Sequence, residues 1–475
     1  MANVTNLLAR RLVKARYTDF PQRVVEKAKQ AILDAIACGI GGSKTELANM
    51  ILHSMEDKDK KEGKYTLYGH STTTSCLEAI FMNGTVSNAL DFDDSYEMGS
   101  ITISHPGATI IPAALAVGEK IDADGRCMIV SIILGYEVAV RVAEALEPRA
   151  DEIWGFGNHQ VFGACVAASK LLGLNEDQMV NSLSIAGSYA PVPSTRQMWS
   201  IDRRPMSWVK EAAGLAALSG ALAALLAREG FVGGRNILDA KSGFHSLAGS
   251  KNFNEGKIID KFGQGGYRIE GISFKPYPTC RFMHPSLDAV SLICQEYDLK
   301  PGDIKHITVE VVSNLEKYFS VYKPKTMIDA QFSLPYALTM VIMRTPVNQE
   351  WYDPSKLMDE EIGNYQTKIE IKSSSILEDL YFKKHILASK VQVTLYNGRT
   401  FTEQINFAKG HPRNPLTSEE LENKFKNLVS PVLGPARAAT IIEVGNNLEE
   451  IKSINELTQL FRAMSTETHS EMIMD

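Results

Sequence analysis

The 475-residue chain lacks the features that mark several protein classes. Its six cysteines include no C-x-x-C pair, so their spacing fits neither a zinc site nor an iron–sulfur site, and reduced thiols are expected. Strongly apolar runs such as 221–227 are far too short to span a membrane. No block of Lys and Arg is present and the formal net charge is −6, which argues against nucleic-acid binding.

The N-terminal residues also lack a charged segment followed by an apolar stretch and a cleavage site, so a cytoplasmic protein is expected. Hydrophobic residues make up 44% of the chain and charged residues 22%, as in soluble globular proteins. A chain of 475 residues exceeds one ordinary core, so two domains are expected.

The order of periodic segments predicts a mainly α protein with an α+β insert. Helical patterns fill the first half, and two stretches rich in Ala and Gly, 163–174 and 212–227, predict closely packed central helices. Weak alternation at 267–274 and clear alternation at 305–312 predict strands, and a hairpin is predicted over 390–402. A helix is predicted over 329–343, and helices resume near Pro415, where residues 417–420 form a capping signal. We therefore expect a helical domain built from residues 1–265 and 406–475, with an α+β domain over residues 266–405.

The stretch 91–95 carries three carboxylates and a hydroxyl, and His105 follows ten positions after Ser95. Ionisable groups are rarely buried unless they are paired or used. Three interpretations are open: a magnesium-binding device, a structural network at a helix end, and an acid/base site. We favour the third, because Asp91 and His105 can form a carboxylate–imidazole arrangement. No second acidic motif supports a metal site, so no metal or cofactor is expected.

A second segment, 275–285, supplies the opposite charge. Prolines on both sides of Tyr277 hold Lys275 on a rigid backbone, and Arg281 can bind a carboxylate through two parallel hydrogen bonds. His284, Tyr277 and Cys280 join the substrate-binding candidates, although packing is the simpler role for the thiol. Together the two segments predict a pocket for a small polyanion.

Two further positions are candidates for the site. Lys210 precedes the Ala-rich helix, where a cation is electrostatically disfavoured unless it is solvated or meets an anionic ligand. His159 stands in a glycine-containing loop before the helix at 163–174, where the imidazole can face a ligand or Asn158 can simply cap the helix.

These residues and their order resemble the MmgE/PrpD family along nearly the whole chain. The matching stretches are 90–95, 105–108, 162–164, 220–230, 275–278, 284–285, 330–336 and 409–415. The resemblance implies the helical domain and α+β lid inferred above, a homodimer, and a metal-free active site between the domains.

The resemblance also implies roles for individual residues. Asp91, Ser95, His105 and Lys275 match family active-site positions directly, whereas Lys210 matches only within about a residue. The loop that carries His159 is shorter than in the decarboxylase branch of the family. That branch also has a shorter turn with an extra histidine where this chain has residues 96–104.

The leading hypothesis is a cofactor-independent lyase acting on a di- or tricarboxylic acid, most simply a 2-methylcitrate dehydratase-like enzyme. In this scheme Lys275, Arg281 and Lys210 hold carboxylates, Asp91 orients His105 for proton transfer, and Ser95 donates a hydrogen bond. Alternatives are a cis-aconitate decarboxylase-like enzyme, an iminodisuccinate epimerase-like enzyme, and a non-catalytic paralogue that binds a carboxylate.

Overall fold

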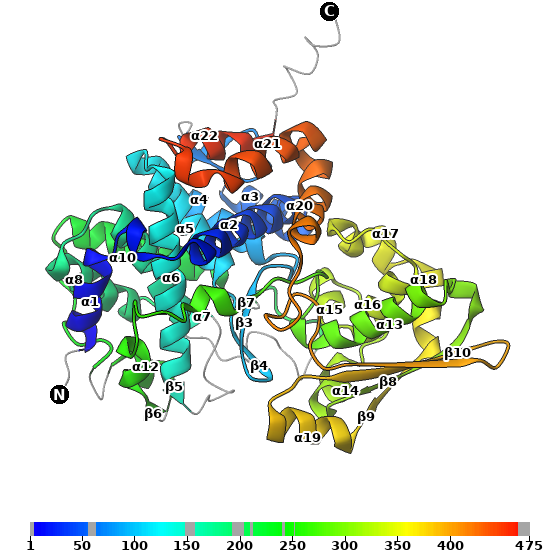
Figure 1. Cartoon of the computed structure of the whole chain (residues 1–475). Helices are drawn as coiled ribbons and strands as arrows, with labels where there is room; N and C mark the ends of the chain where they lie inside the picture. The colour runs from blue at the N-terminus through cyan, green and yellow to red at the C-terminus, as the bar shows by residue number, and fades with distance from the viewer. Residues whose placement is uncertain are drawn as a thin grey trace, which may run out of the picture.

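The computed structural model describes residues 4–55, 63–147, 157–191, 204–209, 212–239, 243–250 and 252–463. A large helical body and a smaller α+β domain lie side by side, and the C-terminal helices return to the body (Figure 1). The expected class, mainly α with an α+β insert, is confirmed. Within the described ranges, no helix has the length and apolar character needed to cross a membrane.

The helical body is a bundle whose apolar faces meet in the interior. Its helices are α1 Val4–Lys14, α2 Gln22–Gly42, α3 Glu46–Met55, α4 Cys76–Asn88, α5 Gly107–Ile121, α6 Gly125–Ala145, α7 Gly157–Leu171, α8 Glu176–Ser188, α10 Ala213–Arg228, α11 Phe244–Leu247 and α12 Glu255–Ile259. Local signals set several helix starts: Ser75 and Glu78 form a capping box on α4, and the carboxylate of Asp124 accepts from the amide of Cys127 in α6.

The two small-residue segments lie in helices α7 and α10, which pack against each other. A β-carbon added to Gly220 of α10 would stand 2.5 Å from the carbonyl oxygen of Val161 and 2.8 Å from the β-carbon of Ala164. Any side chain at position 220 would collide with α7, so glycine at this position lets the two helix backbones approach this closely.

The α+β domain is built on a four-stranded sheet in the order β11-β10-β8-β9. The strands are β8 Ile304–Val311, β9 Ile369–Ser373, β10 Ser389–Leu395 and β11 Thr400–Ile405. Strands β10 and β11 form the expected hairpin with Gly398 at φ 85°, and β8 pairs parallel to β9. Helices of this domain are α13 His284–Glu296, α14 Ser313–Phe319, α15 Met327–Gln331, α16 Leu334–Ile342, α17 Pro354–Leu357, α18 Glu360–Tyr365 and α19 Ser375–Lys384.

Two expected elements differ from the structure. The weak alternation at 267–274 is mostly the short 3₁₀ turn Arg268–Gly271, followed by the two-residue strand β7 Ile272–Ser273. The single helix expected over 329–343 is divided into α15 and α16, because the side chain of Ser333 caps a new helix by accepting from the amide of Tyr336.

The C-terminal helices α20 Ser418–Leu433, α21 Pro435–Asn446 and α22 Asn455–Thr458 complete the helical body. Thr417 and Glu420 form the expected capping box, and α20 and α21 lie against α2 above the rest of the bundle (Figure 1). This packing supports our proposal that residues 1–265 and 406–475 form one domain and residues 266–405 the other.

Candidate active site

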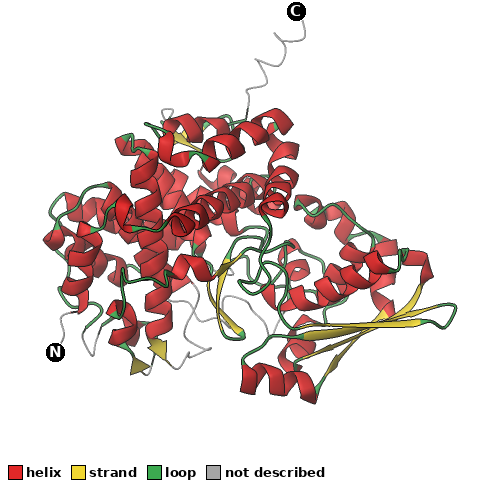
Figure 2. Cartoon of the chain, viewed as in Figure 1, coloured by secondary structure: helices red, strands yellow, loops and turns green. Residues whose placement is uncertain are grey.

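A three-stranded sheet in the order β4-β3-β7 brings the two charged segments together (Figure 2). Strand β3, Ser95–Met98, follows the carboxylate cluster directly, and β4, Ile101–Ser104, ends immediately before His105. Strand β7 pairs Ser273 with Ser95, two residues before Lys275. Three short strands therefore deliver the acidic turn, the imidazole and the lysine to one place.

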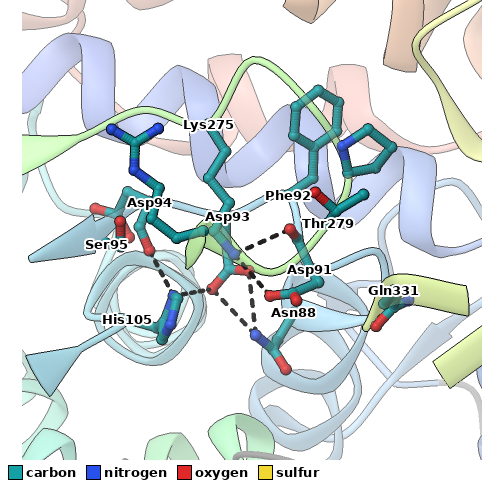
Figure 3. Close-up of polar contacts among 12 residues, drawn as sticks. Asn88, Asp91, Phe92, Asp93, Asp94, Ser95, His105, Lys275, Thr279 and Gln331 are labelled. Carbon is teal, nitrogen blue, oxygen red and sulfur yellow. Dashed lines mark hydrogen bonds and ion pairs between the residues drawn. The ribbon is translucent and has the colours of Figure 1, made fainter. Parts of the chain in front are cut away.

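Asp91 and Lys275 form a buried ion pair at the centre of this place (Figure 3). The Lys275 Nζ lies 2.6 Å from Asp91 Oδ1 and 3.0 Å from the Asp91 carbonyl oxygen. Lys275 has no exposed surface and Asp91 only 2%. Asp91 adopts φ 52°, a left-handed conformation that aspartate tolerates better than most residues. A buried ammonium needs such a partner, because leaving it unpaired is very costly.

His105 is held by the two aspartates that follow Asp91. Its Nδ1 lies 2.9 Å from the carbonyl oxygen of Asp94 and 3.7 Å from Oδ2 of Asp93. A carbonyl oxygen only accepts, so the hydrogen is on Nδ1, and in the neutral ring Nε2 carries the lone pair. Asp91, in contrast, holds Lys275. The expectation that Asp91 orients the imidazole is therefore corrected: Asp93 and Asp94 do so.

Asp94 links the imidazole to the start of helix α5. Its Oδ1 accepts from the amide of Gly107 at 2.8 Å, and its Oδ2 accepts from the hydroxyl of Tyr136 at 2.7 Å. Burial raises the pKa of Asp94 to about 7, and the negative charges of Asp34 and Asp93 act in the same direction. This carboxyl group, which lies next to the histidine, therefore changes between its protonated and ionised forms near neutral pH.

Arg281 binds a carboxylate, but one that belongs to the protein. Its Nε lies 3.1 Å from Oε1 of Glu97, which also accepts from the hydroxyl of Ser95 at 2.8 Å. Ser273 donates to the other carboxylate oxygen at 2.7 Å. Burial raises the pKa of Glu97, but Arg281 and the two serine hydroxyls outweigh it, so the pKa lies below its ordinary value. Glu97 was not among the predicted site residues, although its carboxylate joins both site segments.

His284, Tyr277 and Cys280 support this arrangement from the α+β domain. Nδ1 of His284 accepts from Arg281 at 3.2 Å, and Nε2 donates to the carbonyl oxygen of Thr279 at 3.1 Å. Burial and the cation of Arg281 hold the pKa of His284 well below its usual value, so the ring is neutral. Tyr277 packs edge-on against this ring, and Cys280 is a buried thiol.

His159 contacts Ser104, the last residue of strand β4, which immediately precedes His105. Its Nε2 is 3.1 Å from the hydroxyl of Ser104, and its Nδ1 is 3.1 Å from Oδ1 of Asn158, its neighbour in α7. His159 is completely buried. Lys210, the remaining candidate, lies outside the described residues.

Polar atoms beside the Asp91 turn were also missed by the sequence analysis. Gln331 donates from Nε2 to the carbonyl oxygen of Ala89 at 2.7 Å. Within the described part of the chain, Oε1 of Gln331 and the hydroxyl of Thr279 are buried without a hydrogen-bond partner. Figure 3 shows both on the Asp91 side of the cluster, away from His105. The stretches 275–278 and 330–336, next to Thr279 and around Gln331, carry the family resemblance, and this resemblance was the signal in the sequence that could have identified the two residues.

The arrangement can hold an anion and move a proton. Lys275 supplies a buried ammonium paired with Asp91, and His105 supplies a ring nitrogen whose orientation is set by Asp93 and Asp94. In the ranges that the structure describes, no group of three or more His, Cys, Asp or Glu side chains is placed to hold a metal ion.

Comparison with known proteins shows relatives of similar length. The chain is 24% identical to the cis-aconitate decarboxylase of Homo sapiens over 480 residues, covering 98% of this chain and 96% of that protein. It is 24% identical to the cis-aconitate decarboxylase-like protein oryM of Aspergillus oryzae, covering 96% and 97%. It is 23% identical to a cis-aconitate decarboxylase of Aspergillus terreus, covering 93% and 92%.

Two family models match most of the chain. The MmgE/PrpD N-terminal domain matches residues 6–255 and the MmgE/PrpD C-terminal domain matches residues 277–450. The second match runs through the α+β domain into helices α20 and α21. The chain therefore belongs to the MmgE/PrpD family.

Proposed function

We propose that the protein is a cofactor-independent lyase that acts on a tricarboxylic acid, with decarboxylation of cis-aconitate as the first reaction to test. The observation that carries this proposal is the buried Lys275–Asp91 pair beside His105. The relatives named above favour decarboxylation over the dehydration of 2-methylcitrate, which the sequence analysis put first.

Decarboxylation of an unsaturated tricarboxylate requires a proton donor. The bond between one carboxylate carbon and its neighbour breaks and CO₂ leaves. The electron pair left behind forms a new double bond, and the pair of the old double bond takes up a proton at its far carbon. His105, protonated at Nε2, would supply that proton and regain one from solvent, while Asp93 and Asp94 keep the ring oriented.

Negative charge accumulates on the substrate as CO₂ leaves, so a cation must face it. Lys275 would offset this charge, with Lys210 as a further expected cation. Ser95 would donate a hydrogen bond to a substrate carboxylate when it leaves Glu97, its present partner. Buried polar atoms of Thr279 and Gln331 offer additional hydrogen bonds.

Dehydration of 2-methylcitrate remains the second candidate. The observation that favours it is the hairpin of β3 and β4 directly before His105, where the family resemblance implies a shorter turn in the decarboxylase branch. Dehydration removes a proton from a carbon next to a carboxylate and expels the hydroxyl group as water. The same imidazole and ammonium would serve both reactions, so the substrate pose decides between them.

The test is incubation of the purified protein with cis-aconitate, 2-methylcitrate, citrate and racemic iminodisuccinate, followed by proton NMR. Loss of cis-aconitate with new =CH₂ signals supports the proposal. Loss of water from 2-methylcitrate supports the second candidate, and a changed enantiomer ratio of iminodisuccinate supports an epimerase. Binding without turnover of any substrate would identify a non-catalytic paralogue. The His105→Ala variant gives the background.

A further inference from the structure

Lys424 of helix α20 contacts the carboxylate turn from behind. Its Nζ donates to the carbonyl oxygen of Phe92 at 2.8 Å, between the two aspartates that hold Lys275 and His105. The same ammonium lies 4.1 Å from the centre of the Phe92 ring and 2.6 Å from Oδ1 of Asp34 on α2. All three residues are at most 6% exposed.

The surroundings of this contact are acidic. Burial raises the pKa values of Asp34 and Asp94, and the negative charge of Asp93 acts in the same direction on both. Lys424 opposes this effect on Asp34, and Lys27, stacked 3.9 Å over the ring of Phe274, opposes it from α2. Lys424 is therefore placed to neutralise buried negative charge while it holds the turn.

The segment that leads into α20 also holds the cationic side of the site. The amide of Phe274 donates to the carbonyl oxygen of Gly410 at 3.1 Å, and Arg281 donates to the carbonyl oxygen of Lys409 at 2.9 Å. Gly410 has φ 85°, and an added β-carbon would stand 1.7 Å from the Phe274 carbonyl oxygen. Residues 409–424 thus contact both partners of the Asp91–Lys275 pair through their neighbours.

We propose that Lys424 is a positioning residue for the reaction, which fixes the Asp91–Asp94 turn through the Phe92 carbonyl group. The inference rests on the proposed function, since it concerns turnover at the same site. Lys424 does not touch the reacting atoms, so its loss should lower kcat with little effect on KM. A displacement of about 1 Å at a catalytic group can cost about 100-fold in rate.

The test variant is the double substitution Asp34→Asn/Lys424→Met, because Lys424→Met alone would leave Asp34 buried and uncompensated. The matched control is Lys29→Met/Glu449→Gln. Lys29 also joins α2 to the C-terminal helices, with Nζ 2.8 Å from the carbonyl oxygen of Asn446 and 3.1 Å from Glu449, but contacts no site residue.

We expect kcat to fall about 10- to 100-fold in the test variant, KM to stay within about threefold, and the control to match wild type. A second readout does not need turnover: the His105 signal in a histidine-selective NMR spectrum, assigned with the His105→Gln variant, should shift in the test variant alone. If wild type converts no substrate but this signal shifts, the proposed function fails and the positioning role stands.

A folded test variant with wild-type kcat, or with an unshifted His105 signal, would overturn the inference. Should the double variant fail to fold, Lys424→Arg gives the same comparison. It keeps the charge beside Asp34, but the planar guanidinium cannot place one nitrogen on both Phe92 and Asp34. The same fall in kcat and the same shift are then expected.

Discussion

At the scale of single residues, Lys275 shows how a fully buried ammonium is kept. Both the carboxylate and the carbonyl oxygen of Asp91 accept from it, and Asp91 has a left-handed backbone conformation. Removing one partner of a buried pair typically costs about 3–5 kcal/mol of stability. A buried ion pair adds little net stability over apolar packing, so its presence beside His105 favours a chemical role.

The imidazole can be tested directly. His105→Ala removes the proposed proton donor, and general acid catalysis typically contributes about 10²–10⁴-fold, so kcat should fall by that much. Circular dichroism should show the fold retained. His306→Ala is the control, because His306 is partly exposed on β8 and pairs only with Glu370 among the contacts described. Activity within a few-fold of wild type in His105→Ala would remove His105 from the mechanism.

Asp94 predicts a pH dependence of stability. Its pKa is raised from 3.8 to about 7 in the folded protein, so the folded state binds the proton more tightly than the unfolded chain. This contribution is fully present below about pH 4 and is lost as pH rises through 7, at up to about 1.4 kcal/mol per pH unit. Asp94→Asn lacks it.

Urea denaturation of wild type and Asp94→Asn at several values between pH 4.5 and 7.5 would check this sign. The free energy of unfolding of the variant should improve relative to wild type as pH increases. A difference that stays constant across the range would mean that Asp94 is already ionised in the folded protein at low pH.

Among the secondary-structure elements, the short strands β3, β4 and β7 position the charged groups of the site. Each ends within two residues of a charged group of the site, and pairing of Ser95 with Ser273 sets where Lys275 meets the turn. A one-residue slip in a strand pair turns every side chain to the opposite face. Strand register therefore determines the geometry of the ion pair.

Close packing of α7 and α10 gives a stability prediction. In Gly220→Ala the new methyl group would meet the Val161 carbonyl oxygen at 2.5 Å, and such overpacking typically costs about 1–3 kcal/mol. Gly234→Ala is the control, because no atom lies within 4 Å of the added β-carbon, and its effect should be within about 0.5 kcal/mol. Thermal unfolding of both variants measures the difference; equal values would contradict the close approach.

In the molecule as a whole, the C-terminal helices α20 and α21 pack against the N-terminal helix α2. Lys424 joins α20 to α2 and to the turn at Phe92, so the helical domain and its site are complete only once the last helices have folded. Contacts of such large sequence separation are entropically costly to form early. The C-terminal segment is thus expected to dock late.

The family resemblance also predicts a homodimer. Size-exclusion chromatography with light scattering should give a mass twice that of the 52.4 kDa chain. A single-chain mass at micromolar concentration would contradict this expectation. The Asp91–Lys275 pair and the hydrogen bond from His105 to the Asp94 carbonyl oxygen form within one chain, so a single-chain mass would not remove these contacts.

The helix order, the hairpin at 390–402, the two charged segments and the family could be predicted from the sequence, because periodicity, turn residues and motif order are local properties. The hydrogen-bond partners of the site residues could not, because they depend on how distant segments pack. Asp91 meets Lys275 across 184 positions, and Lys424 meets Phe92 across 332. Likewise Arg281 is bound by Glu97 and not left for a substrate. Hydrogen bonds depend on distances within a few tenths of an ångström, which composition and spacing do not encode.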